Sequence, residues 1–405
     1  MVTTTDFVRG SSRLIFDSVA GITSAVEGMH ETIARHPLPW SPQPEQATRA
    51  HGLIAASVYA SIRGINSLVR EGVDLSVALL PEATTGREST AAAIQAIAAL
   101  NGVLGDHLEA TGNPLATTMQ FRTPEQFVSL ERESLAATVA HASGHIVVLV
   151  HGLSMSELCW SKAGTPGIGQ RLQESLAFTP LYLRYNTGRH ISTNGQDFAG
   201  ELEQLCANWP VPVESLSLIG HSMGGLVIRS ACWYAQQAGS EWLRHLQRVV
   251  CLGTPHHGSV VAKAGHGLNA AMERIAYTQP LAFGRRRSAG IKDLRHGDLL
   301  DEDWRDHHPD ASRPDTRRPV PLLDGVEYYF AAATLGRDRH DPVGHLLGDL
   351  LVRMDSATGS HRDDVRRLDI KPENCRVFHE KNHFDLLYDA HVQQQILEWF
   401  SAERG

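Results

Sequence analysis

A serine between two glycines is the residue best placed to do chemistry in this chain. Ser222 lies in the segment Gly220-His-Ser-Met-Gly224, where a short apolar run changes directly into a helical pattern. Glycines two positions before and after the serine leave room for a sharp turn, because they lack a Cβ atom. Such a turn exposes the hydroxyl at a helix N-terminus, where free N–H groups favour a developing oxyanion. The pattern predicts a nucleophile.

A serine hydroxyl is a weak nucleophile, so it needs a base, and the base needs a carboxylate that orients it. The best candidate for the base is His383, because it lies on the loop between the last predicted strand and the last predicted helix. From such a loop an imidazole can reach the nucleophile. His379 and His391 are rivals, but the first is expected within a strand and the second within a helix.

The candidates for the acid follow the predicted strand at 327–333. In enzymes built on a sheet of this kind, the acid lies between the serine and the histidine in the chain. Asp349 and Asp355 are both close enough to the carboxyl edge of the sheet. Asp355, before Ser-Ala, looks more like a helix N-cap or turn carboxylate. Asp338 and Asp341 are lesser rivals.

An oxyanion hole needs two backbone donors aimed at one point. The first is expected to be the N–H of Met223, which directly follows the nucleophile. An early apolar strand ends in His151-Gly152, and the glycine lets the backbone approach a substrate. The second donor is therefore expected to be the N–H of Leu153.

The elements that must position these residues alternate between strands and helices after residue 115, which is typical of an α/β sheet. A short edge strand is expected at 119–122, and 124–142 is expected to be mostly helical. Residues 259–325 exceed a usual connection and are expected to form a cap or lid. The further strands are expected at 145–150, 180–185, 214–220, 246–253, 327–333 and 376–379, and the helices at 167–176, 196–207, 223–237 and 391–400.

Residues 1–115 differ from the rest and predict a helical N-terminal region, followed by a catalytic domain over 116–405. Apolar side chains recur every three or four positions within 11–35 and 54–73, and an alanine-rich segment covers 88–110. The first two helices are expected to fold back as an antiparallel hairpin. Their apolar stripes would pack on the catalytic domain or on a second copy in a homodimer; the alternative is a lipid or polymer surface.

Composition excludes several classes. With 405 residues, 42% hydrophobic residues and 20% charged residues, the chain is expected to be globular. A net charge of −8 argues against a nucleic-acid partner. The five cysteines include no Cys-x-x-Cys pair, so we expect neither a disulfide framework nor a metal site. No signal peptide or membrane span is recognisable, which favours a cytoplasmic location.

Taken together, these segments resemble the α/β-hydrolase superfamily, in particular its bacterial lipase and esterase branch, over about residues 116–405. The resemblance implies Ser222 as nucleophile, Asp349 as acid and His383 as base, with an oxyanion hole formed by Leu153 and Met223. Relatives usually read Asp-Gly-Leu-Val at the acid, whereas this chain has Asp-Leu-Leu-Val. The segments that carry the resemblance begin at His151, Gly220, Leu252, Gly348 and Asn382.

The expected activity is therefore that of a serine hydrolase that cleaves carboxylic esters through an acyl-enzyme, without a cofactor. Its substrate is expected to be a small-molecule or lipid ester. An acyltransferase that uses the same triad is one alternative, because only the exclusion of water separates acyl transfer from hydrolysis. A lipid- or polymer-surface-binding protein with a secondary hydrolase domain is another alternative.

Overall fold

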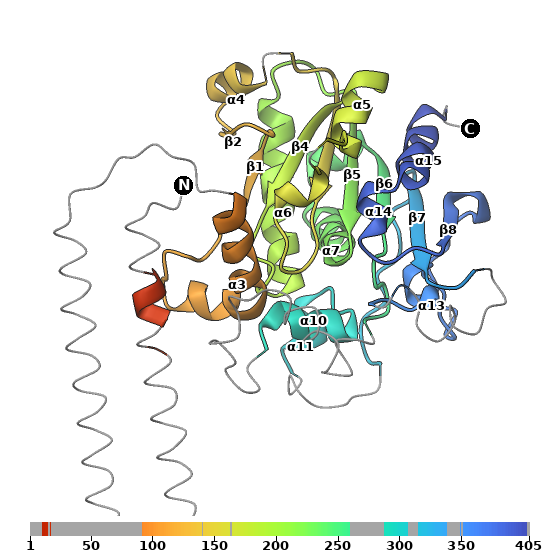
Figure 1. The fold of residues 1–405 in the computed structure, drawn as a ribbon. Coiled ribbons are helices and arrows are strands. Elements are labelled where there is room, and N and C mark those ends of the chain that lie inside the picture. The colour runs from red at the N-terminus through yellow and green to blue at the C-terminus, as the bar shows by residue number, and fades with distance from the viewer. Residues whose placement is uncertain are drawn as a thin grey trace, which may run out of the picture. The chain divides into compact units, whose positions relative to one another are not determined.

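The computed structural model describes residues 10–14, 17, 91–139, 141–162, 164–259, 287–306, 315–337, 349 and 351–402. These residues contain an eight-stranded sheet in the order β2-β1-β4-β3-β5-β6-β7-β8 (Figure 1). β1 is antiparallel to both of its neighbours, and the remaining neighbours are parallel. The predicted α/β fold with a mostly parallel sheet is confirmed. The strands are β1 (Gln120–Arg122), β2 (Phe127–Val128), β3 (His145–Val150), β4 (Thr179–Arg184), β5 (Ser215–His221), β6 (Leu246–Leu252), β7 (Glu327–Thr334) and β8 (Cys375–His379).

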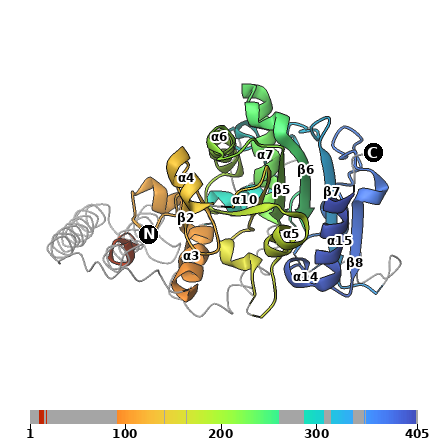
Figure 2. The ribbon, with the colours of Figure 1, turned by 90° about the horizontal axis from the view of Figure 1, so that it is seen from above.

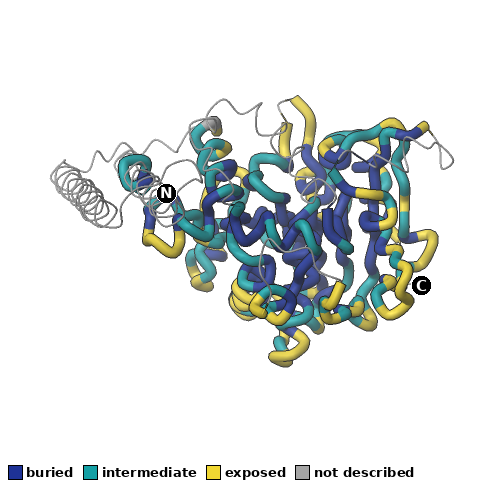
Figure 3. Tube along the Cα trace, turned by 90° about the horizontal axis from the view of Figure 1, so that it is seen from below, coloured by how far each residue is buried: buried dark blue, intermediate teal, exposed yellow. Residues whose placement is uncertain are grey.

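The central strands are buried on both faces because each face carries its own layer of helices. In β3, Ile146 and Val148 belong to one hydrophobic cluster, whereas Val147 and Leu149 belong to the other. This alternation follows from the two-residue period of a strand. Figure 3 shows the result as a band of buried backbone through the sheet.

Helices α6 and α7 cover one face, and helices α5 and α15 cover the other (Figure 2). Phe198 of α6 and Leu226 of α7 lie in the first cluster, and Leu172 of α5 and Ile396 of α15 lie in the second. Among the described residues, no helix is long and apolar enough to cross a membrane. The helices are α3 (Ala91–Ala110), α4 (Arg132–Thr138), α5 (Ile168–Leu176), α6 (Ile191–Asn208), α7 (Met223–Ala238), α10 (Ala289–His296), α11 (Asp301–Trp304), α13 (Met354–Ala357), α14 (Asp385–Tyr388) and α15 (Ala390–Ser401).

Two local predictions were wrong. The segment 124–142 was expected to be mostly helical, but it contains β2 and only a short α4. The hydroxyl of Thr123 accepts the backbone N–H groups of Glu125 and Gln126, and this turn folds β2 back onto β1. β2 therefore forms the edge in place of β1.

Helix α6 begins five residues earlier than expected, at Ile191. The carboxylate of Asp293, in α10, accepts the N–H of Ile191 at 2.8 Å. An acceptor for one of the free N–H groups of the first turn stabilises a helix start. Because Asp293 is distant in the chain, no local pattern marks this start.

The chain divides into two compact units: Met1–Thr90 with Ala110–Leu115, and Ala91–Glu109 with Ala116–Gly405. Nearly all of α3 therefore belongs to the unit that contains the sheet. The domain boundary expected after residue 115 stays a prediction.

Most of the two predicted amphipathic helices lies outside the described residues, which include a helical stretch at 10–14. Of the predicted cap at 259–325, the described parts contain α10 and α11. The remaining parts of that segment, 260–286 and 307–314, lie outside the described residues.

Candidate active site

Ser222 forms the turn between β5 and α7. β5 ends at His221 and α7 begins at Met223, and Ser222 has a φ of 54° and a ψ of −122°. Residues other than glycine rarely adopt a positive φ. A methyl group at Gly224 would lie 2.2 Å from the carbonyl oxygen of Val150, so glycine is required where α7 approaches β3. The segment thus has the strand–turn–helix geometry that its sequence predicts.

Asp349 and His383 form a buried pair. Oδ2 of Asp349 lies 2.6 Å from Nδ1 of His383, and the backbone N–H of His383 donates to the carbonyl oxygen of Asp349 at 3.3 Å. The other carboxylate oxygen, Oδ1, accepts the N–H groups of Leu351 at 2.9 Å and Val352 at 2.7 Å. An ionised carboxylate only accepts hydrogen bonds, so Nδ1 of His383 carries the proton that is shared with Asp349. Nε2 is then left to accept a proton.

The imidazole of His383 lies beside the turn that holds Ser222. The N–H of Ser222 donates to the carbonyl oxygen of Leu252, the last residue of β6, at 2.8 Å. A methyl group on the next residue, Gly253, would lie 2.9 Å from Cε1 of His383. Nε2 of His383 is buried and has no hydrogen-bond partner among the described residues. The structure therefore gathers Ser222, Asp349 and His383 at the carboxyl edge of the sheet.

The rival residues do not share this arrangement. Asp355 is exposed in the first turn of α13, and no ion pair joins it to a histidine among the described residues. The side chain of His391 is 87% exposed, and its neighbour is Asp389. His379 is the last residue of β8. The remaining acid candidates, at 338 and 341, lie outside the described residues.

Leu153 and Met223 both belong to segments that contact or adjoin Ser222. Met223 is the first residue of α7, so its N–H has no acceptor within the helix. A methyl group at Gly152 would come within 3.0 Å of Cβ of Ser222, so the turn that carries Leu153 passes directly beside the serine. Beyond it, the N–H of Ser154 donates to Oγ1 of Thr187 at 3.1 Å, which fixes the turn.

Two buried histidines, His151 and His221, support this site; we call them the flanking histidines. Nε2 of His221 lies 3.2 Å from the carbonyl oxygen of His383, so it donates its proton there and holds the loop of the base. His151 stacks on Tyr185, whose hydroxyl donates to the carbonyl oxygen of His151 at 2.8 Å. Burial lowers the pKa of His151 to about 4 and lowers the pKa of His221 well below its ordinary value. Both rings are therefore neutral near pH 7.

Helix α3 backs the turn that carries Leu153. A methyl group at Gly102 would lie 1.9 Å from Oγ of Ser154 and 2.9 Å from its Cα, so the helix and the turn are in close contact. The carbonyl oxygen of Gly102 accepts the hydroxyl of Ser288 at 2.6 Å, and the carbonyl oxygen of Gly105 accepts Nδ2 of Asn186 at 2.9 Å. Sequence reasoning missed this role. The signal was the Gly-x-x-Gly spacing within an alanine-rich helix.

Comparisons with known proteins bear on one part of the chain. Residues 140–298 match a family model described as "Putative serine esterase (DUF676)". This span is less than half of the chain; it includes Leu153, Ser222 and Met223 and ends before Asp349 and His383. No curated protein matches the sequence.

Several solved structures are similar at low identity. Mature lipase BlEst2 of Bacillus licheniformis is 18% identical, with a TM-score of 0.39, over 63% of this chain and 91% of that chain. Lipase B of Aspergillus fumigatus is 11% identical, with a TM-score of 0.40, over 69% of this chain and 60% of that chain. Phospholipase PlaB from Legionella pneumophila is 18% identical, with a TM-score of 0.33, over 53% and 45%.

The assignment rests on the family match and on the sheet, because the solved structures are too distant to add to it. The parallel strands, the turn at Ser222 and the match over 140–298 agree with one another. Residues 140–298 are therefore similar to this esterase family, and the mostly parallel sheet is consistent with the α/β-hydrolase fold.

Proposed function

We propose that this protein is a serine hydrolase that cleaves carboxylic esters through an acyl-enzyme on Ser222. The observation that carries the proposal is the state of His383. Its Nδ1 is held by Asp349 at 2.6 Å, and its buried Nε2 has no hydrogen-bond partner among the described residues. The imidazole lies beside Gly253, and the residue before that glycine, Leu252, accepts the N–H of Ser222. An imidazole that is oriented through one nitrogen, unpaired at the other and close to the turn of a serine is suited to general-base catalysis.

In the proposed reaction, Nε2 of His383 takes the proton of the Ser222 hydroxyl while Oγ attacks the carbonyl carbon of the ester. The negative charge that forms on the carbonyl oxygen accepts hydrogen bonds from the N–H groups of Leu153 and Met223. The intermediate collapses, and the alcohol leaves with the proton from His383. Water then attacks the acyl-enzyme, again with His383 as base, and releases the carboxylate and the free serine.

The test is covalent labelling by an alkyl phosphonate together with a chain-length series of aryl esters. Ser222→Ala is expected to abolish labelling and to lower kcat by about 10⁴-fold or more, with folding preserved. Ser360→Ala is the matched control, because Ser360 is an exposed serine whose hydroxyl lies 3.1 Å from that of Thr358. Undiminished labelling of Ser222→Ala would refute the assignment of the nucleophile.

A further inference from the structure

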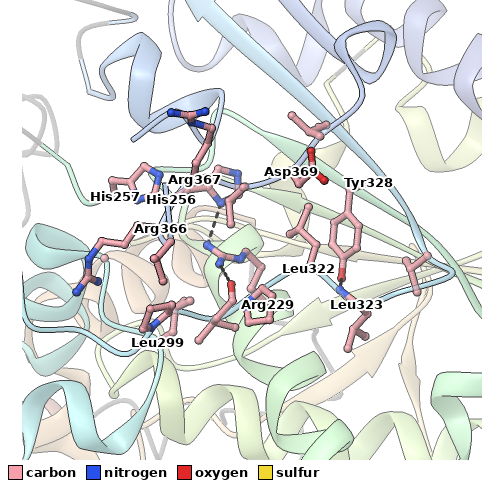
Figure 4. Close-up of a pocket in the computed structure, with 18 of the residues that line it drawn as sticks. Arg229, His256, His257, Leu299, Leu322, Leu323, Tyr328, Arg366, Arg367 and Asp369 are labelled. Carbon is pink, nitrogen blue, oxygen red and sulfur yellow. Dashed lines mark hydrogen bonds between the residues drawn. The ribbon is translucent and has the colours of Figure 1, made fainter. Parts of the chain in front are cut away.

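A cavity of about 810 Å³ opens on a part of the molecule that the proposed reaction does not use. Its wall comes from α7, the segment after β6, the segment that leads into β7 and the segment before β8, and none of Ser222, Asp349 and His383 lines it. Figure 4 shows the lining side chains, with Arg229 of α7 near the centre and His256 next to it.

The guanidinium of Arg229 is buried without a carboxylate. Among the described residues, no carboxylate oxygen lies within 4 Å of it, and the residue is 5% exposed. Nη2 donates to the carbonyl oxygen of Val320 at 2.6 Å, and Nη1 donates to Nδ1 of His256 at 3.3 Å. Nε has no acceptor among the described residues. A guanidinium has five N–H groups, so these two bonds leave donor capacity unused.

His256 adds a second donor at the same end of the cavity. An arginine can only donate, so Nδ1 of His256 accepts from Arg229 and the ring proton lies on Nε2. Nε2 is buried and has no partner among the described residues, and the ring is fixed by stacking on Phe330 at 4.4 Å between centroids. Burial, followed by the charge of Arg229, keeps the pKa of His256 well below its ordinary value, so the imidazole is neutral.

The lining carboxylates, Asp324 and Asp369 included, form no ion pair with Arg229 among the described residues. Arg317 and Arg366 share Asp315 as their carboxylate. Asp303 accepts three backbone N–H groups, and Glu327 accepts a lysine and an asparagine side chain. Burial, together with the nearby cation Arg317, lowers the pKa of Arg229 to about 10. A buried charge is costly unless an opposite charge accompanies it.

Apolar side chains line much of the remaining wall. A cavity of this volume, with a few convergent donors and apolar sides, has the character of a small-molecule site. The apolar lining side chains include Leu299, Val320, Leu322, Leu323, Tyr328 and Leu368.

We propose that this cavity binds an amphiphilic organic anion, whose carboxylate or phosphate head group accepts hydrogen bonds from Arg229 and His256 and whose apolar body lies along the leucine-rich wall. The head group supplies the negative charge that Arg229 lacks. Guanidinium N–H groups donate equally well to carboxylate and phosphate oxygens, so the cavity is assigned to an oxyanion head group of either kind.

The test is calorimetric titration of the full chain with octanoate, octyl phosphate, octanol and inorganic phosphate. At least one of the two amphiphilic anions is expected to bind, and octanol and inorganic phosphate are expected to bind at least tenfold more weakly. Arg229→Gln is expected to weaken binding by about 10- to 100-fold, the usual contribution of charge-assisted hydrogen bonds. Leu322→Trp fills the cavity from its apolar wall and is expected to have a similar effect without altering the buried arginine.

Two controls locate the site. Arg318→Ala removes a cation that also lines the cavity but pairs with Glu302, and it is expected to change affinity less than about threefold. Protein labelled with phosphonate is expected to bind the amphiphilic anion as tightly as unlabelled protein does, because Ser222 does not line the cavity. If the phosphonate fails to label Ser222, the proposed activity is refuted while the Arg229 and Leu322 variants still test the cavity.

Any of the following results would overturn the proposal. The first is no binding of either amphiphilic anion up to about 5 mM, which is weaker than a specific site provides. The second is equal binding of octanol or inorganic phosphate, which would show that the head group or the wall contributes nothing. The third is loss of binding on phosphonate labelling, or binding that Leu322→Trp leaves unchanged. Selection of octanoate or of octyl phosphate would identify the head group.

Discussion

Replacing Asp349 by asparagine tests the proposed triad most sharply, because asparagine keeps the shape of the side chain and removes its charge. If the amide oxygen occupies the position of Oδ1, it still accepts the N–H groups of Leu351 and Val352 at 2.9 and 2.7 Å. The loop is therefore expected to keep its structure. The amide nitrogen would then face Nδ1 of His383, where the carboxylate oxygen now lies 2.6 Å away.

This exchange reverses one hydrogen bond. An amide N–H donates, so Nδ1 of His383 must become the acceptor and the ring proton must move to Nε2. Nε2 could then no longer accept the proton of Ser222. The expected loss in kcat/KM is about 10³- to 10⁴-fold, or roughly 4–5.5 kcal/mol of transition-state stabilisation. Asp349 is 1% exposed, so water does not replace the missing carboxylate.

The assay is hydrolysis of a soluble aryl ester, with Asp355→Asn as the matched control. Asp355 is exposed in α13, and its substitution is expected to lower kcat/KM by less than about tenfold. Circular dichroism and urea unfolding would show whether both variants fold. A folded Asp349→Asn protein within tenfold of the wild type would refute the assignment of the acid, and so would a larger loss in Asp355→Asn.

Three further predictions follow from the surroundings of the site. Gly102→Ala is expected to lower kcat about tenfold, because the added methyl group displaces the turn of the proposed oxyanion hole. Gly200→Ala, in α6 where nothing lies within 4 Å of the added methyl group, is the control and is expected to leave activity unchanged and to add up to about 1 kcal/mol of stability. Equal kinetics for the two variants would contradict the role of α3. Removal of residues 1–90 is expected to reduce solubility or to change the oligomeric state, while small esters are still hydrolysed. Removal of residues 1–110 also deletes α3 and is expected to lower activity. If the truncated protein keeps its oligomeric state but no longer binds lipid vesicles or polyester granules, the surface-binding alternative is favoured. The flanking histidines have lowered pKa values in the folded protein, so below about pH 6.5 the unfolded chain binds protons that the folded chain does not. The free energy of unfolding is therefore expected to fall by about 1.4 kcal/mol per histidine for each pH unit between about 6 and 4.5. Equal free energies of unfolding in urea at pH 7.5 and 5.0 would contradict neutral rings.

The sequence was sufficient for features that depend on neighbours in the chain. The central strands are continuous apolar runs bounded by turns, and β3 was predicted with its observed ends at His145 and Val150. The turn at Ser222 was also predictable, because its glycines and the change from strand to helix are adjacent in sequence.

Features that depend on distant residues were not predictable in this way. The start of α6 is set by Asp293, and β2 is a strand because it pairs with β1. The acid was ambiguous for the same reason. Asp349 and Asp355 follow the same strand. Asp349 is distinguished by its contact with His383, 34 residues further along the chain, where Oδ2 lies 2.6 Å from Nδ1.

Helix α3 shows how a helix that the sequence predicts can have contacts that the sequence does not reveal. Its alanines and glycines predict a helix that can pack closely, and the sequence analysis included it in the helical N-terminal region over residues 1–115. Its glycines instead contact the turn after Leu153: added methyl groups at Gly102 and Gly105 would meet Ser154 and Asn186 at less than 2 Å. The small residues therefore bring a helix backbone against the loops of the site. The compact unit that contains Ser222, Asp349 and His383 also contains residues 91–109, so α3 can support the turn of the proposed oxyanion hole from within the same unit.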